Sequence, residues 1–173
     1  MADVVARARE PMLGAIKLAW WRERLQELES GRVPAEPRLR AVAAELLPRG
    51  VAGADLAELT DGWATLLEKN PDVERMASGG AKLFATGASL LGASDPMIDA
   101  AGRLYRRSQV VRRNLTTVDW PLDALHAVSR HRFQKALRPL SALAALAARP
   151  AEEPEATPGR SWTLIRHRLT GRI

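Results

Sequence analysis

Arginine side chains gather in one segment of this sequence, at a spacing that suits phosphate binding. Residues 103–113 carry five of them, at Arg103, Arg106, Arg107, Arg112 and Arg113. Steps of three and four residues bring side chains to one face of a helix. Guanidinium groups on such a face bind phosphate oxygens through charge-assisted hydrogen bonds. Our candidate diphosphate-binding residues are therefore Arg106, Arg107, Arg112 and Arg113, and the alternative is a solvated charged face.

Two carboxylates, Asp95 and Asp99, stand four residues apart upstream of these arginines. This spacing puts both on one helix face, where a carboxylate pair can ligate Mg²⁺. Acidic residues also favour the first turn of a helix, and we prefer this explanation. The histidines His126, His131 and His167 lack metal-ligand spacing, so no metal site is assigned.

The charge of the chain is concentrated in its second half. Among 173 residues, 26 are Lys or Arg and 20 are Asp or Glu, which gives a net charge of +6. Residues 101–173 contain 14 of the basic residues and five of the acidic ones. Such asymmetry favours an anionic partner, either a phosphorylated ligand or a membrane surface. Nucleic acid is a weaker candidate, because Tyr105 is the one aromatic residue within the arginine segment.

Several classes of protein are excluded by composition. Cysteine is absent, which excludes disulfides, thiolate catalysis and cysteine-built metal sites. The apolar runs are too short for a membrane-spanning helix, and the N-terminal segment lacks the apolar core of a signal peptide. We expect a cytoplasmic protein of a GC-rich bacterium, with peripheral contact with the inner membrane as an addition.

The elements that position these residues are predicted to be helices. Strong helix formers are abundant, and aromatic residues make up 5% of the chain. Apolar spacing and Pro or Gly boundaries predict an all-α protein with helices over 11–30, 37–47, 54–69, 72–91, 96–114, 119–149 and 161–169. Asp119 should cap the sixth helix, and Pro139 should kink it.

Apolar stripes predict which faces are buried. The first helix should bury Leu18, Trp21, Leu25 and Leu28, in a stripe widened by Leu13, Ile16 and Trp20. The last helix carries Trp162, Ile165 and Leu169 on one face, which we expect to dock onto the protein itself, with a membrane-interface anchor as the alternative.

The helix over 72–91 is rich in small residues, including Gly79, Gly80 and Gly87. Glycine inside a helix costs about 1 kcal/mol relative to Ala, so these positions predict close approach of another helix or of a ligand. The predicted domains are a helical domain over 1–149, a Pro- and Glu-rich linker over 150–159, and a short basic helix over 160–173.

Two further motifs are typical of a known family. A Leu-x-x-Trp-Arg segment is followed by two prolines, at Leu18, Trp21, Arg22, Pro34 and Pro37. A small-residue run, AGRL, occupies 101–104, and the chain ends on RHRLTGRI. Together these features resemble the squalene/phytoene synthase family over nearly the whole chain.

The resemblance implies an isoprenoid-synthase fold, in which a helical bundle surrounds a central cavity. It also implies that this cavity is lined by Gly79, Gly80, Gly87 and Tyr105. In that family, two aspartate-rich motifs bind Mg²⁺, which holds two prenyl diphosphates for head-to-head condensation by neutralising the leaving group. Here the first helix and its motif are expected to be missing, which leaves an apolar face of the bundle open. At the second motif, residues 105–114 carry arginines in place of the acids.

We therefore predict a degenerate, non-catalytic member of the family, and enzyme activity is a question for experiment. The alternative is a helical scaffold or respiratory complex assembly factor that acts through protein or membrane contacts. No cofactor is expected, and Mg²⁺ would enter only with a bound prenyl diphosphate. The expected partners are a prenyl diphosphate and a protein, or a second copy of the chain, over the open face.

Overall fold

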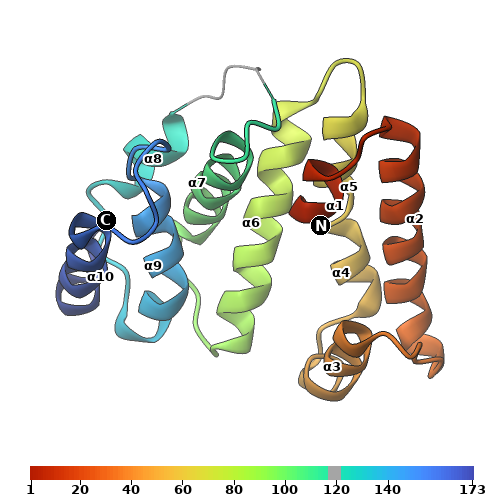
Figure 1. The fold of residues 1–173 in the computed structure, drawn as a ribbon. Coiled ribbons are helices and arrows are strands. Elements are labelled where there is room, and N and C mark those ends of the chain that lie inside the picture. The colour runs from red at the N-terminus through yellow and green to blue at the C-terminus, as the bar shows by residue number, and fades with distance from the viewer. Residues whose placement is uncertain (117–121) are drawn as a thin grey trace. The chain divides into compact units, whose positions relative to one another are not determined.

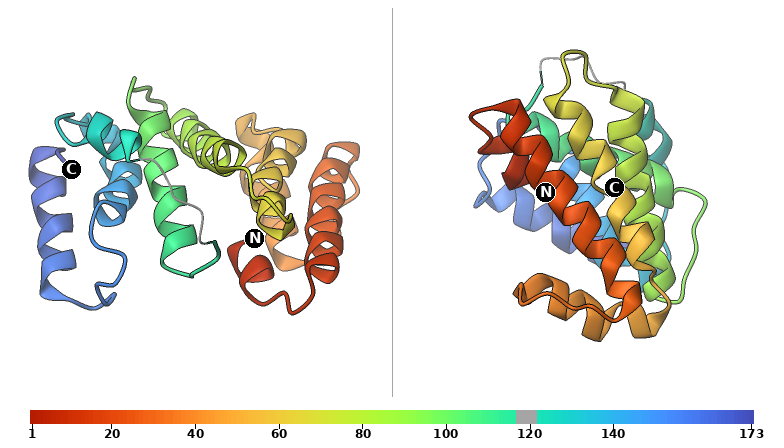
Figure 2. Two further views of the ribbon diagram at one scale, coloured as in Figure 1. Left: turned by 90° about the horizontal axis from the view of Figure 1, so that it is seen from above. Right: turned by 90° about the vertical axis from the view of Figure 1, so that its right-hand side faces the viewer.

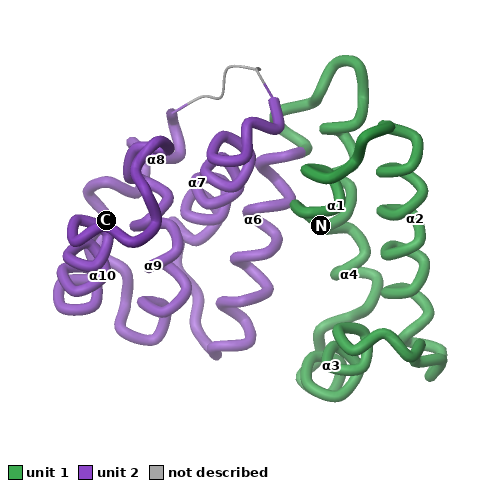
Figure 3. The backbone as a smooth tube through the Cα atoms, viewed as in Figure 1, with its two compact units in different colours: residues 1–75 green, residues 76–173 purple. Residues whose placement is uncertain are grey.

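The computed structural model describes residues 1–116 and 122–173 (Figure 1). The predicted all-α class is confirmed, because all regular elements over these residues are helices, apart from an isolated bridge between Arg132 and Arg172. None of the described helices has the length and apolar character needed to cross a bilayer. The chain divides into two compact units, 1–75 and 76–173 (Figure 3). The predicted linker, 150–159, and the terminal helix both belong to the second unit.

The first unit consists of short helices packed on one long one. Its elements are α1 (Ala2–Ala6), α2 (Pro11–Glu27), α3 (Pro37–Glu45), α4 (Gly53–Glu58) and α5 (Asp61–Ala64), with 3₁₀ turns at Leu28–Ser30, Leu47–Arg49 and Thr65–Leu67. Pro11 occupies the first turn of α2, and Gly31, with φ of 76°, ends the helical segment. The core joins Leu25 and Leu28 to Leu39 and Ala57.

Two expectations for this unit need correction. Of the predicted stripe, Leu18, Leu25 and Leu28 are buried and Trp21 is half-buried, whereas Leu13, Ile16 and Trp20 are exposed. The reason is that α4 packs along one side of α2 and leaves the neighbouring side uncovered. The predicted helix over 54–69 is divided into α4, α5 and a 3₁₀ turn. At the first break the Thr60 hydroxyl donates to the Ala57 carbonyl at 2.7 Å, a local bond that competes with helix continuation.

The second unit holds the remaining helices. They are α6 (Val73–Leu90), which begins at the end of the first unit, α7 (Ile98–Val111), α8 (Asp123–Val128), α9 (Arg138–Ala147) and α10 (Pro158–Thr170). In Figures 1 and 2, α9 lies beside α10, and it also packs on α7. Phe84, Leu104, Phe133 and Leu137 are fully or almost fully buried at the centre of the core.

The prediction of one helix over 119–149 is wrong. Asp119, its expected cap, lies outside the described residues. Further on, α8 ends at Val128, and a loop and a 3₁₀ turn (Lys135–Leu137) precede α9. Pro139 does not kink a helix but sits in the first turn of α9, where the missing N–H of proline is harmless.

Candidate functional site

A cavity of about 460 Å³ lies in the second unit, where α7, α9 and the beginning of α10 meet. A volume of this size suits a small-molecule ligand. The polar lining consists of Tyr105, Ser108 and Gln109 from α7, Arg112 and Arg113 directly after its end, and Glu155 and Arg160 from the segment that leads into α10 and its first turn. The apolar lining consists of Leu143, Leu146 and Ala147 from α9. The cavity therefore offers both cationic and apolar surface to one ligand.

Helical periodicity explains how these side chains converge. On α7, the lining residues recur at steps of one, three and four, so they share one side of the helix. On α9, Leu143, Leu146 and Ala147 follow the same rule. Because α7 packs on α9, the polar side of one helix faces the apolar side of the other across the cavity.

The two arginines that follow α7 at the cavity are hydrogen-bonded to neutral oxygens. Arg112 donates from Nη2 to the Glu153 carbonyl at 2.9 Å and from Nη1 to the Pro150 carbonyl at 3.4 Å. Arg113 is exposed and donates from Nη1 to the Gln109 side-chain oxygen at 2.6 Å. Carbonyl and amide oxygens orient a guanidinium group without neutralising it. Glu155 is the acidic residue of this lining, beside three arginines.

A clasp between Arg149 and Glu153 fixes the segment that Arg112 contacts. Both the Nε and Nη2 atoms of Arg149 donate to the Glu153 carboxylate, and Thr157 donates to the same carboxylate at 2.8 Å. The hydrogen bond from Arg149 is the main cause that lowers the pKa of Glu153 to about 2. Arg149 also reaches Thr163 of α10, with 2.9 Å between Nη1 and Oγ1. The clasp thus ties α9, the predicted linker and α10 together beside the cavity.

The other two predicted arginines do not line this cavity. Arg106 is only 3% exposed and lies where α6 crosses α7. The two helices are so close there that a Cβ added at Gly80 of α6 would lie 2.6 Å from the Cβ of Arg106. Desolvation by burial lowers the pKa of Arg106 to about 10, and the side chain stays charged at neutral pH. At about 100° per residue, Arg107 falls on the side of α7 opposite the lining residues. Of the four arginines predicted to bind diphosphate, the structure therefore places Arg112 and Arg113 at the cavity.

The predicted cavity residues are divided in the same way. Tyr105 lines the cavity, but Gly80 packs against Gly102 of α7, where an added Cβ would overlap the Gly102 carbonyl. Gly79 is buried, and a Cβ on Gly87 would meet the Leu140 side chain of α9 at 3.1 Å. At Gly80 and Gly87 the closest approach is thus by another helix.

The carboxylates Asp95 and Asp99 have different surroundings. Asp95 accepts a hydrogen bond from the Met97 amide at 2.9 Å, just before α7 begins, and its carboxylate pairs with His131. Asp99 lies exposed in the first turn of α7. Among the described residues, no group of three or more His, Asp or Glu side chains is arranged to hold a metal ion.

Sequence reasoning missed several lining residues, among them Arg160, Leu143 and Leu146. Arg160 belongs to the predicted last helix, so its charge was a usable signal, but its approach to α7 depends on the turn over 150–157. Leu143 and Leu146 belong to an apolar segment, and apolar spacing alone does not distinguish cavity-lining residues from core residues. No protein-family model matches this chain, and no curated protein or solved structure matches it at a significant level.

Proposed function

We propose that this chain is a non-catalytic relative of the squalene/phytoene synthases that binds a prenyl diphosphate directly through arginine. One observation carries the proposal: the cavity beside α7 joins the cationic side chains of Arg112, Arg113 and Arg160 to the apolar side chains of α9. A prenyl diphosphate has the same two parts, an anionic head and a hydrocarbon tail. The head would accept charge-assisted hydrogen bonds from the guanidinium groups, and the tail would lie against Leu143 and Leu146.

The surroundings of the carboxylates support the non-catalytic part of the proposal. Ionising a prenyl diphosphate requires a group that neutralises the leaving charge and a site that excludes water. Asp95 is already engaged with His131 and with the start of α7. Arginine at 112 and 113 offers fixed positive charge for binding, but it offers no oxygen ligand for the Mg²⁺ that the family uses to neutralise the leaving diphosphate.

The proposal includes an isoprenoid-synthase-like arrangement of the helices and a place in the cytoplasm, in peripheral contact with a membrane. Within the second unit, it assigns α7 to the diphosphate and α9 to the prenyl chain. Mg²⁺ is not needed for binding, although it would accompany a diphosphate that arrives as its magnesium complex.

Calorimetric titration with farnesyl diphosphate tests this proposal, with inorganic diphosphate and farnesol as probes of the head and the tail alone. We expect farnesyl diphosphate to bind more tightly than either fragment. Arg113→Gln should weaken its binding roughly tenfold or more, the worth of a hydrogen bond to a charged group. Arg107→Gln is the control, because it removes the same charge from α7 at a position that does not line the cavity.

Two results would contradict the proposal. The first is the absence of binding heat with a chain whose circular dichroism shows that it is folded. The second is a hydrocarbon product released from farnesyl diphosphate, because this would make the chain an enzyme.

A second candidate, a helical scaffold, is favoured by one feature of the first unit. The side of α2 that α4 leaves uncovered exposes Met12, Leu13, Ile16 and Trp20, which lie within about two and a half turns. An apolar stripe of this size suits contact with another protein. This candidate predicts that polar substitutions at Leu13 and Ile16 abolish a protein interaction and leave farnesyl diphosphate binding unchanged.

A further inference from the structure

The terminal helix α10 exposes its apolar side and buries polar residues, which is the reverse of an ordinary surface helix. Its apolar side chains face outward: Trp162, Ile165 and Leu169 are 65%, 50% and 71% exposed. At about 100° per residue, these three positions fall within an arc of about 60°. The buried residues Thr163 and His167 lie on the nearly opposite side. A surface helix of a globular protein usually turns its apolar stripe inward.

Hydrogen bonds hold α10 in this orientation. On its inward side, Thr163 accepts from Arg149 at 2.9 Å, and His167 Nε2 lies 2.9 Å from the Ser141 hydroxyl of α9. At its C-terminal end, Arg138 of α9 donates to the carbonyls of Arg168 and Leu169 at 2.7 and 3.3 Å. Rolling the apolar stripe inward would break these bonds and bury it against polar groups. The exposed stripe is therefore a fixed feature of the second unit.

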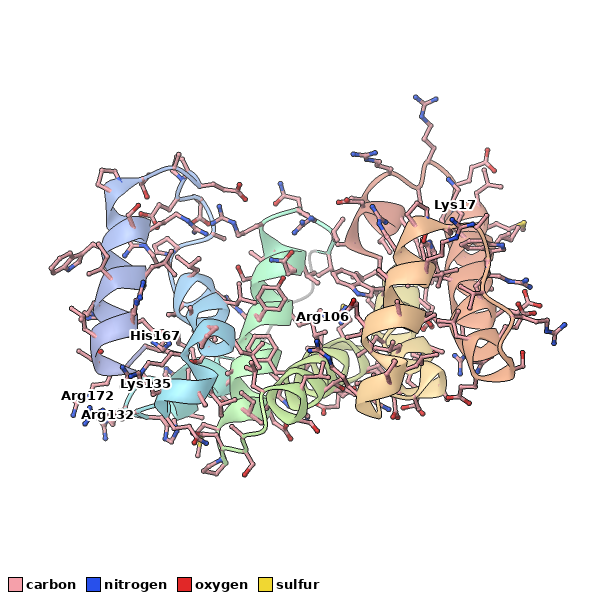
Figure 4. The ribbon with its side chains drawn as sticks, turned by 90° about the horizontal axis from the view of Figure 1, so that it is seen from below. Lys17, Arg106, Arg132, Lys135, His167 and Arg172 are labelled. Atoms are coloured by element: carbon pink, nitrogen blue, oxygen red, sulfur yellow. The ribbon has the colours of Figure 1, made fainter. Side chains whose placement is uncertain are left out.

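Positive charge flanks the stripe within α10. Arg166 and Arg168 flank it on either side, and α10 contains no Asp or Glu. Figure 4 shows Arg132, Lys135 and Arg172 gathered with His167 where the C-terminal end of α10 meets the beginning of α9.

A cavity of about 470 Å³ lies in the groove between α9 and α10, on the Arg168 side of the stripe. Lys135, Arg138 and Arg168 line it together with His167, Leu164 and two small residues of α9. No carboxylate is among the lining residues. A phosphate-sized anion in this groove would meet only cationic or neutral side chains. Arg168 of the groove directly precedes Leu169 of the exposed apolar stripe.

We infer that α10 is a docking surface for an anionic phospholipid bilayer, with Trp162, Ile165 and Leu169 in the interface and lipid phosphates at Arg166, Arg168 and the groove. A convex helix with an apolar stripe between cations fits the boundary between headgroups and acyl chains. A second copy of this chain is a poorer occupant, because a symmetric contact would bring these cations against one another. The inference deepens the peripheral membrane contact of the proposed function, and it does not depend on prenyl diphosphate binding.

Cosedimentation of the full chain with lipid vesicles tests the inference. We compare vesicles of phosphatidylcholine alone with vesicles that also contain phosphatidylglycerol. The chain should bind the anionic vesicles, bind the neutral ones much more weakly, and be released by added salt. Binding that is equal for the two compositions, or absent from both, would overturn the inference, and the absent case would point to an acidic protein partner.

Paired variants separate the apolar and the charged contributions. Leu169→Gln should reduce binding to anionic vesicles about tenfold, because it removes a side chain that the bilayer would bury. Leu91→Gln, at a residue 45% exposed after α6, is its control. Arg166→Gln combined with Arg168→Gln should reduce binding roughly 25-fold, at about fivefold per arginine near an anionic surface.

The control for the charge pair is Arg38→Gln with Arg40→Gln, an equally spaced and exposed arginine pair on α3. Equal losses in the α10 and control pairs would overturn the inference. Because all these side chains are exposed, the variants should keep wild-type helicity. Titration of the α10 variants with farnesyl diphosphate, without vesicles, should match the wild type, so that a failure here is distinct from a failure of the proposed function.

Discussion

The Nε2 atom of His131 lies 2.8 Å from Oδ1 and 2.9 Å from Oδ2 of Asp95. The Asp95 side chain is 6% exposed, and the same carboxylate accepts the Met97 amide before α7 begins. One carboxylate thus fixes both the start of the arginine-bearing helix and the loop that precedes α9. This engagement supports a structural role for Asp95, in place of the metal-binding role that its spacing from Asp99 allowed.

Asp95→Ala should destabilise the protein by about 2 kcal/mol in urea unfolding, through loss of the cap-like bond and of the His131 contact. Asp99→Ala is the matched change at an exposed first-turn acid, and we expect an effect within about 0.5 kcal/mol. A melting temperature that rises with Mg²⁺ in the wild type, and in neither variant, would instead establish the two residues as metal ligands.

The crossing of α6 and α7 gives a second stability test. Gly80→Ala should lower the free energy of unfolding by about 2 kcal/mol, because its Cβ would overlap the Gly102 carbonyl, which is backbone and cannot move aside cheaply. Gly87→Ala should be neutral or stabilising, since its Cβ meets only the Leu140 side chain and Ala is the better helix former. Equal effects of the two substitutions on urea unfolding would contradict this packing.

The clasp of Arg149 and Glu153 predicts a defined acid sensitivity. The pKa of Glu153 is lowered from 4.5 to about 2 in the folded chain. Between these two values, the Glu153 carboxyl group is therefore protonated to a smaller extent in the folded chain than in the unfolded chain. Its contribution to stability is complete above about pH 4.5 and is lost as the pH falls through 2.

Glu153→Gln should therefore be less stable than the wild type at neutral pH, and the difference should shrink between pH 4.5 and 2. Urea unfolding across this range measures it. The neighbouring exposed residue provides the control as Glu152→Gln, which should follow the wild-type pH profile. A difference between wild type and Glu153→Gln that stays constant with pH would contradict the assigned role of the clasp.

Local signals in the sequence accounted for the boundaries of most helices. Pro11 and Gly31 enclose α2 and its 3₁₀ extension, and Pro37 begins α3, because each residue acts on its own backbone. The sixth predicted helix failed because its interruption has distant causes. The Phe133 amide bonds to the Gly171 carbonyl at 2.8 Å, and His131 reaches Asp95. Both contacts join residues far apart in the sequence, so the apolar spacing around residues 129–137 does not reveal that the helix is interrupted there.

The candidate site was predictable to a similar degree. Three- and four-residue spacing identified the arginine-rich helix, but spacing cannot decide which side of a helix faces a cavity. In the structure, contact with α9 gives Arg112 and Arg113 that position, and the crossing with α6 buries Arg106. The stripe on α10 shows the same limit, since its three apolar residues were found from the sequence and their outward orientation depends on Thr163 and His167.

The most direct measurement is calorimetric titration of the folded full chain with farnesyl diphosphate, with Mg²⁺ and again with the metal chelated. Direct arginine binding predicts micromolar affinity in both conditions and a loss of roughly tenfold or more in Arg113→Gln. Binding that requires Mg²⁺ would contradict it, because acidic ligands would then hold the diphosphate. Absence of binding heat in both conditions would remove prenyl diphosphate as the ligand of this chain.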